Sequence, residues 1–153
     1  MIKEFNDKNL IIPLWTEAFG DSEEDIVFFL NNCKNMKCVG CFDDEELLSM
    51  LFLVDCKLDN SNSKYIYAAC TYKKYRGSGA MSKLLDYCKS NFKNVCLIPA
   101  DDKLVCFYKK RGFEKEFDVD KIIFDESDDI NEYLFEGCQL EKPIILAYKN
   151  LGD

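Results

Sequence analysis

Histidine is absent from this sequence of 153 residues, and that absence narrows the chemistry available to the chain. Imidazole is the commonest metal ligand and a frequent base for serine and cysteine nucleophiles. Nine cysteines are present, but a zinc site needs four ligands, and only Cys38 and Cys41 form a close pair, with Cys33 nearby. If residues 38–41 form a strand, the two thiols of the pair face opposite sides of it. We therefore expect no bound metal, and cysteines that act mostly as small core residues.

Long apolar segments and positive net charge are also lacking. No run reaches the ~18 apolar residues of a membrane-spanning helix, and residues 1–4 begin no signal-peptide pattern. We therefore expect a cytoplasmic protein with no membrane partner, in which an odd number of cysteines stays reduced. The formal net charge of −8 opposes non-specific nucleic-acid binding, which needs a basic surface. The same charge suits a cationic amine, although acidic proteins are often acidic for solubility alone.

The most informative stretch, residues 65–85, reads YIYAACTYKKYRGSGAMSKLL. Its first part, through Thr71, is rich in aromatic and β-branched residues and is typical of a strand. A helix is predicted to begin at the glycines Gly77 and Gly79, because apolar residues then recur at helical spacing: Met81, Leu84, Leu85, Cys88 and Phe92. Free N–H groups at a helix start, beside residues without side chains, favour a phosphate group. Basic residues surround this loop in an otherwise acidic chain: Lys73, Lys74, Arg76 and Lys83.

Two phosphate-binding motifs can be compared with this stretch. A P-loop needs Gly-Lys-Ser/Thr, which does not follow Gly79, so this motif is excluded. The dinucleotide fingerprint G-x-G-x-x-G fits better, as Gly77-x-Gly79-x-x-Ser82 with Asp101 about 20 residues further on. It lacks the third glycine, and residues 72–76 separate the strand from the first one. A nucleotide-binding domain of this type is therefore a lesser alternative.

The stretch also resembles the GNAT superfamily of acyl-CoA-dependent N-acyltransferases, whose signature Q/R-x-x-G-x-G/A follows a strand and opens a helix. It can be aligned as Arg76-x-x-Gly79-x-Met81, which departs at Met81, or as Lys74-x-x-Gly77-x-Gly79, which departs at Lys74. The residues 14–30, LWTEAFGDSEEDIVFFL, resemble a bacterial subgroup described as predicted acetyltransferases.

A second family segment, N-x-x-A-x-x-F-Y-x-x-x-G-F, is similar to residues 101–113. Asp101 replaces the asparagine and Leu104 the alanine, and four positions match: Phe107, Tyr108, Gly112 and Phe113. Two segments in the expected order, separated by one helix and one strand, strengthen the resemblance.

The resemblance implies an α/β (α+β mixed sheet) fold, with one mixed, mostly antiparallel sheet and helices on both faces. It implies an N-acetyltransferase that uses acetyl-CoA (CoA) as cofactor and a primary amine as acceptor, which attacks the thioester directly. We expect a single domain, residues 1–153, acting on a small-molecule or peptide amine, and leave a homodimer open. The alternative is a module of the same fold that binds acyl-CoA without turnover.

The resemblance also implies roles for particular residues. The acyl and pantetheine arm is expected along residues 69–71 and the pyrophosphate on the N–H groups of residues 77–81. The full cofactor-binding set is Ala69, Cys70, Thr71, Arg76, Gly77, Ser78, Gly79, Ala80, Met81, Asp101 and Phe107. Tyr108 is expected to protonate the departing CoA thiolate, with a core or CoA-stacking aromatic as its other interpretation. Cys70 lacks the histidine that would activate it, and residues 64–72 hold no carboxylate base.

The remaining segments complete the predicted sheet. Helices are expected over residues 6–19, from residue 21 onward, and from residue 101 or 102 to 111, with a helical turn over 130–135. Strands are expected over 37–42, 47–58, 64–72, 95–98, 113–124 and 143–149, with polar turns at 43–46 and 60–63. The last strand is predicted to lie antiparallel to residues 113–124.

Overall fold

The computed structural model describes residues 1–149, which form eight strands and five α-helices. The strands are β1 Ile2–Phe5, β2 Met36–Asp43, β3 Glu46–Leu58, β4 Ser61–Thr71, β5 Asn94–Leu97, β6 Lys115–Asp118, β7 Ile122–Ile123 and β8 Ile144–Lys149. The helices are α1 Lys8–Phe19, α2 Glu23–Asn32, α3 Ala80–Asn91, α4 Asp102–Lys109 and α5 Asp128–Phe135. Within the described range, no helix combines the length and the apolar character needed to cross a membrane.

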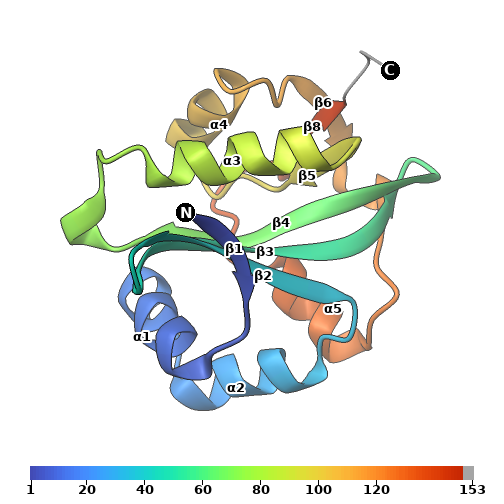
Figure 1. Ribbon diagram of the computed structural model, residues 1–153. Coiled ribbons are helices and arrows are strands. Elements are labelled where there is room, and N and C mark those ends of the chain that lie inside the picture. Colours follow the sequence, from blue (N-terminus) through green and yellow to red (C-terminus); the bar gives the residue numbers. More distant parts are fainter. Residues whose placement is uncertain (150–153) are drawn as a thin grey trace.

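All eight strands belong to one mixed sheet (Figure 1). Their order is β1-β2-β3-β4-β5-β8-β6, and the short β7 pairs with β3. The pair β4–β5 is parallel, and the other pairs are antiparallel. Helices α1, α2 and α5 lie on one face, and α3 and α4 lie on the other (Figure 1). The predicted mixed, mostly antiparallel sheet with helices on both faces is confirmed.

Local capping explains where the first two helices begin and end. The Asp7 side chain accepts a hydrogen bond from the Asn9 N–H, and Gly20 ends α1 with a left-handed φ of 74°. The Ser22 side chain accepts from the Asp25 N–H at 3.1 Å and starts α2. Acidic residues in the first turn of α2 also suit the positive end of its dipole. These caps follow the sequence signals that predicted both helices.

Two apolar cores fill the space between the sheet and its helices. On the first face, Trp15 lies 5.3 Å from Phe52 and 5.5 Å from Phe29, measured between ring centroids. Cys38 belongs to this core, whereas Cys41 belongs to the core under α3 and α4. The prediction that these two thiols face opposite sides of their strand is therefore confirmed. Among the described residues, no three cysteine or acidic side chains are grouped as metal ligands.

The structure differs from the prediction in three places: one predicted strand is divided, one strand was not predicted, and one turn is displaced. Residues 113–124 form no single strand, because a 3₁₀ turn at Val119–Lys121 separates β6, which pairs with β8, from β7, which pairs with β3. Strand β1 was not predicted, because its four residues, IKEF, show only one repeat of alternation. The turn expected at 60–63 lies earlier, at Asp59 and Asn60, which both adopt positive φ. The antiparallel pairing of the last strand is confirmed for residues 115–118.

Candidate functional site

The candidate site lies where the two parallel strands separate. Strands β4 and β5 pair only near their starts, through Lys64 with Val95 and Tyr65 with Cys96. Strand β5 ends at Leu97, close before Pro99, whereas β4 continues to Thr71. We call this region, residues 67–71 of β4 and residues 98–100, the β4–β5 divergence. Because the ladder stops there, the backbone of β4 is free on that side to contact another molecule.

Strand β4 contains a β-bulge inside the β4–β5 divergence, and the bulge changes the direction of the strand. Tyr67 pairs with Phe52 and Cys70 with Met50, so the two residues between them on β4 face Leu51 alone. One of them, Ala68, has a left-handed φ of 52°, which alanine rarely adopts. Bulges of this kind twist a strand and change where its groups point. No residue in this stretch indicates the bulge, because glycine is the residue expected at such a φ.

The predicted phosphate loop connects β4 to α3. A 3₁₀ turn, Lys73–Tyr75, precedes two glycines, Gly77 and Gly79, which both have φ of 84°. Gly79 is the N-cap of α3. Because glycine has no side chain, it forms no capping hydrogen bond with the first N–H groups of the helix. Within the described part of the chain, no acceptor contacts the N–H groups of Gly77, Gly79, Ala80 and Met81. A Cβ added at either glycine would meet no atom within 4 Å, so the space beside both glycines is open.

The side chains of this loop divide between surface and core. Arg76 and Ser78 are exposed, and the Ser78 N–H donates to the Tyr75 carbonyl at 3.2 Å. Ala80 is buried in the second core and Met81 is half-buried against it. The free backbone groups, together with the basic side chains, fit a pyrophosphate. Gly77, Gly79, Ala80 and Met81 supply the N–H groups, and Arg76 supplies charge.

Tyr108 approaches the divergence from α4. Its side chain is only 7% exposed, and its hydroxyl has no hydrogen-bond partner among the described residues. Burial raises the pKa of Tyr108 to about 12; the nearby Cys70 thiol raises it further and Arg111 opposes the rise. The phenol is therefore protonated at neutral pH and can donate its proton. Its ring packs edge-on against Phe107 and Phe113.

Two other predicted residues of the second segment have structural partners. The Asp101 carboxylate accepts from the Leu104 N–H at 2.9 Å and caps α4. Phe107 is half-buried, and the Arg111 guanidinium carbon lies 3.5 Å from the centre of its ring. Arg111 also donates to the Ser82 hydroxyl at 3.3 Å, which links α4 to the first turn of α3. Sequence reasoning missed Arg111, although its spacing of four residues from Phe107 was a usable signal.

Cys70 lies at the centre of the site but is a poor nucleophile. Burial raises the pKa of its thiol to about 12, the Glu17 carboxylate adds to the rise, and Arg76 opposes it. A reactive cysteine needs the opposite shift, toward the thiolate. Cys70 and Thr71 pair with Met50 and Ser49 of β3, and Ala69 and Thr71 remain half-buried. The three predicted residues 69–71 thus lie together at the divergence.

The face with α1, α2 and α5 carries acidic and aromatic side chains beside the site. The Trp15 indole donates to the Asp21 carboxylate at 2.8 Å, and Phe28 stacks on Tyr133 with centroids 5.8 Å apart. Burial raises the pKa of Tyr67, and Asp21 and Glu136 add to that rise. Two carboxylates therefore lie near this tyrosine of β4. This side of the sheet is acidic, whereas the phosphate loop is basic.

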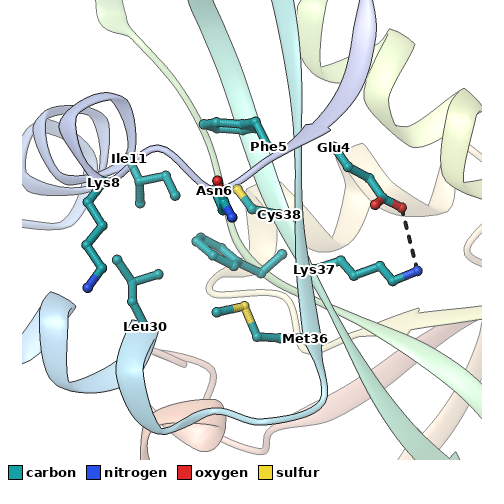
Figure 2. A pocket seen from close by; sticks show the side chains of 10 residues that line it. Glu4, Phe5, Asn6, Lys8, Ile11, Leu30, Met36, Lys37 and Cys38 are labelled. Atoms are coloured by element: carbon teal, nitrogen blue, oxygen red, sulfur yellow. Dashed lines mark ion pairs between the residues drawn. The ribbon is translucent and has the colours of Figure 1, made fainter.

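A separate cavity of about 560 Å³ lies elsewhere on the same face, between α1, α2, β1 and β2 (Figure 2). Its lining residues are Glu4, Phe5, Asn6, Lys8, Ile11, Leu30, Met36, Lys37, Cys38 and Phe52. None of the predicted site residues lines it. Trp15 contacts Phe52 at its edge and Tyr67 beyond it, with centroids 5.3 and 5.9 Å apart, so packed aromatic rings separate the cavity from the divergence.

Comparison with known proteins identifies the class. Residues 4–115 match the family model described as an acetyltransferase (GNAT) domain. By this match, which covers most of the chain, the protein belongs to the GNAT acetyltransferase family. Among curated proteins, no match to the sequence is found.

Solved structures share the fold. An acetyltransferase from Streptococcus agalactiae 2603 has 17% identity and a TM-score of 0.63, and each chain covers 97% of the other. A GNAT family acetyltransferase from Elizabethkingia anophelis with acetyl-CoA bound has 13% identity and a TM-score of 0.64, again with 97% coverage of both chains.

A probable N-acyltransferase from Enterococcus faecalis V583 has 20% identity and a TM-score of 0.56 over 73% of this chain. This chain spans only 31% of that protein, so it corresponds to one part of a longer chain. At these identities the structural likenesses establish the fold alone.

Proposed function

We propose that this chain transfers an acetyl group from acetyl-CoA to a primary amine, which attacks the thioester directly. The observation that carries the proposal is the pairing of two features at one site. Free N–H groups begin α3 beside glycines that border open space, and the buried, protonated Tyr108 belongs to the second core, against which Ala69 of β4 packs. The first feature suits a pyrophosphate and the second suits a departing thiolate.

Different segments of the chain would bind different parts of acetyl-CoA. The free N–H groups of Gly77, Gly79, Ala80 and Met81 would hold the pyrophosphate, with charge from Arg76. The free edge of residues 69–71 holds the pantetheine arm and orients the thioester carbonyl. Asp101 contributes by capping α4, and Phe107 contributes an aromatic surface stiffened by Arg111. When bound, acetyl-CoA supplies the acyl group on a leaving thiolate.

The properties of Cys70 support direct attack by the amine. An acyl-enzyme would need this thiol as its thiolate, but burial raises its pKa to about 12 and the chain has no histidine to activate it. Tyr108 then has one chemical role, which is to give its proton to the sulfur as the carbon–sulfur bond breaks. A phenol suits this task because it stays neutral until the thiolate forms.

Calorimetry with acetyl-CoA and mass spectrometry of a panel of amines test the proposal. We expect acetyl-CoA to bind and at least one primary amine to gain an acetyl group. Binding without turnover for every amine would overturn the enzymatic proposal and favour a module that binds acyl-CoA. Absence of acetyl-CoA binding would overturn both the enzyme and the acyl-CoA-binding module, and would favour the nucleotide-binding alternative.

A further inference from the structure

The proposed reaction needs a group that receives the acceptor amine, and β4 carries no carboxylate for this purpose. At neutral pH an alkylamine is an ammonium ion, which must lose a proton before its nitrogen can attack. The acceptor also needs a counter-charge that holds it at the divergence. A group on the face opposite Tyr108 would meet the amine as it approaches the thioester.

Glu17 is placed to be that group. It lies in the last turn of α1, and its Oε2 accepts the Lys73 backbone N–H at 2.9 Å, just beyond the end of β4. Its other carboxylate oxygen has no partner among the described residues. Trp15, two residues earlier, fixes α1 against β4 through its contact with Tyr67, with centroids 5.9 Å apart. Glu17 is therefore held by the helix and the loop while one oxygen faces solvent.

Electrostatic effects place both Glu17 and Tyr108, the proposed general acid, in the surroundings of Cys70. The Glu17 carboxylate is near enough to raise the pKa of Cys70, after the larger effect of burial, and Cys70 acts in the same way on Tyr108. Helix α1 and Cys70 belong to the first core, whereas Tyr108 belongs to the second, on the other face of the sheet. The carboxylate and the phenol thus approach the divergence from opposite faces.

Two of the neighbouring carboxylates already accept hydrogen bonds from side chains. Glu46 accepts a hydrogen bond from the Tyr75 hydroxyl, and Asp21 accepts one from the Trp15 indole. Glu136 lies near Tyr67, on the part of β4 that precedes the bulge. Of the acidic residues close to Cys70, Glu17 is the one that acts on its thiol.

We propose that Glu17 binds the acceptor ammonium at the β4–β5 divergence and takes its proton. This inference rests on the proposed acetyl transfer. The ammonium gives one proton to the Glu17 carboxylate, and the nitrogen lone pair then forms the new bond to the thioester carbonyl carbon. The carbon–sulfur bond breaks, the sulfur takes the Tyr108 proton, and the phenolate regains a proton from the acylated nitrogen. Glu17 returns its proton to solvent, so one proton is released for each amide formed.

The test compares two substitutions that separate binding of the amine from anchoring of the loop. Glu17→Gln keeps an oxygen that can accept the Lys73 N–H but removes the charge and the proton acceptor. Glu17→Ala removes both. Glu23→Gln, on the exposed start of α2, is the control for the change in net charge. For each protein, kcat/KM for an alkylamine and KM for acetyl-CoA are measured with the amine that the wild type acetylates.

We expect Glu17→Gln to lower kcat/KM for the alkylamine on the order of 10²-fold, the lower end of general-base contributions. Its KM for acetyl-CoA should stay within about twofold, since one hydrogen bond at most is altered. Glu17→Ala should weaken both parameters, and Glu23→Gln neither. A Glu17→Gln enzyme equal to wild type would overturn the role of Glu17 and leave only a loop anchor. A wild type that binds acetyl-CoA but acetylates no amine would instead overturn the proposed function, and the role of Glu17 with it.

Discussion

At the level of single residues, burial decides what each titratable group at the site can do. Burial raises the pKa of both Tyr108 and Cys70 to about 12. For the phenol this keeps the proton that a general acid must give. For the thiol it removes the thiolate that a nucleophile must have. Burial therefore supports Tyr108 as a general acid and opposes Cys70 as a nucleophile.

Tyr108→Phe tests the acid role directly. The substitution keeps the ring and its packing against Phe107 and Phe113 but removes the proton donor. Because general acids typically contribute ~10²–10⁴-fold, kcat should fall by about that factor. The acetyl-CoA Kd should change little, since one neutral hydrogen bond is worth only ~1 kcal/mol.

Tyr87→Phe is the matched control, because Tyr87 is a half-buried tyrosine on α3 outside the site residues. An unchanged kcat for Tyr108→Phe, where chemistry limits the rate, would contradict the acid role. Weaker acetyl-CoA binding with an intact kcat would make Tyr108 a cofactor contact.

The cysteines allow a second prediction at the same scale. Seven are buried, and burial raises the pKa of Cys33, Cys70 and Cys88 to about 12, whereas Cys106 is exposed. Since the thiolate is the reactive form, N-ethylmaleimide at pH 7.5 should modify Cys106 first and the half-buried Cys138 more slowly.

Intact mass spectrometry against time measures this order. The seven buried thiols should react only after denaturant is added, at which point all nine should be modified. Rapid labelling of more than two cysteines in the native protein would show that the cores open readily.

At the level of elements, the strand, loop and helix of residues 65–85 were predictable because each carries a strong local signal. Aromatic and β-branched residues form β4, the glycines adopt positive φ, and apolar spacing continues through α3. The bulge at Ala68 was not predictable, because it arises from the pairing of β4 with β3 and not from a local preference. Arg111 follows Phe107 by four residues, which was a usable signal, but its contact with Ser82 of α3 arises only through folding.

Strand prediction failed where the pairing partner changes. Residues 113–124 are predicted as one strand from their local composition alone. The chain instead leaves β8 after Asp118 and reaches β3 at Ile122, which requires the intervening turn. Tertiary pairing overrides local propensity at this position.

The start of α3 provides a prediction at this scale. Gly79→Val places a branched side chain in the open space beside the free N–H groups. Each charge-assisted hydrogen bond to phosphate is worth ~1.5–3 kcal/mol, so loss of even one should weaken acetyl-CoA binding by about tenfold or more. Calorimetry measures the Kd.

Gly20→Val is the control for backbone strain. Gly20 has a φ of 74°, Gly79 has a φ of 84°, and an added Cβ meets nothing within 4 Å at either position. Both substitutions therefore strain the backbone, but only one lies at the proposed phosphate site. Equal acetyl-CoA affinities for the two variants would place the pyrophosphate elsewhere.

At the level of the whole molecule, the sheet separates two halves of the proposed chemistry. Helices α3 and α4 lie on one face of the sheet and α1, α2 and α5 lie on the other (Figure 1). Tyr108 belongs to α4 and the basic loop leads into α3, whereas Glu17 belongs to α1. The sequence could indicate the first half, because its residues fall in two short segments. It could not indicate the second, since Asp21, Tyr67 and Tyr133 are far apart in the chain and meet only through folding.

Acetyl-CoA should stabilise the whole fold, because its proposed contacts come from β4, the loop, α3 and α4 together. A ligand at 100 times its Kd adds ~2.7 kcal/mol to the free energy of unfolding. In a domain of this size each kcal/mol raises Tm by roughly 2–4 °C, so the expected rise is about 5–11 °C.

Thermal unfolding with and without acetyl-CoA measures this rise, with ATP and NAD as comparison ligands. The Gly79→Val variant should lose most of the rise, whereas Gly20→Val should keep it, even if both unfold at a lower temperature without ligand. Stabilisation by NAD or ATP but not by acetyl-CoA would favour the nucleotide-binding alternative, because the glycine loop would then hold a different phosphate ligand. Equal stabilisation of both glycine variants by acetyl-CoA would show that the cofactor binds the fold without using the start of α3.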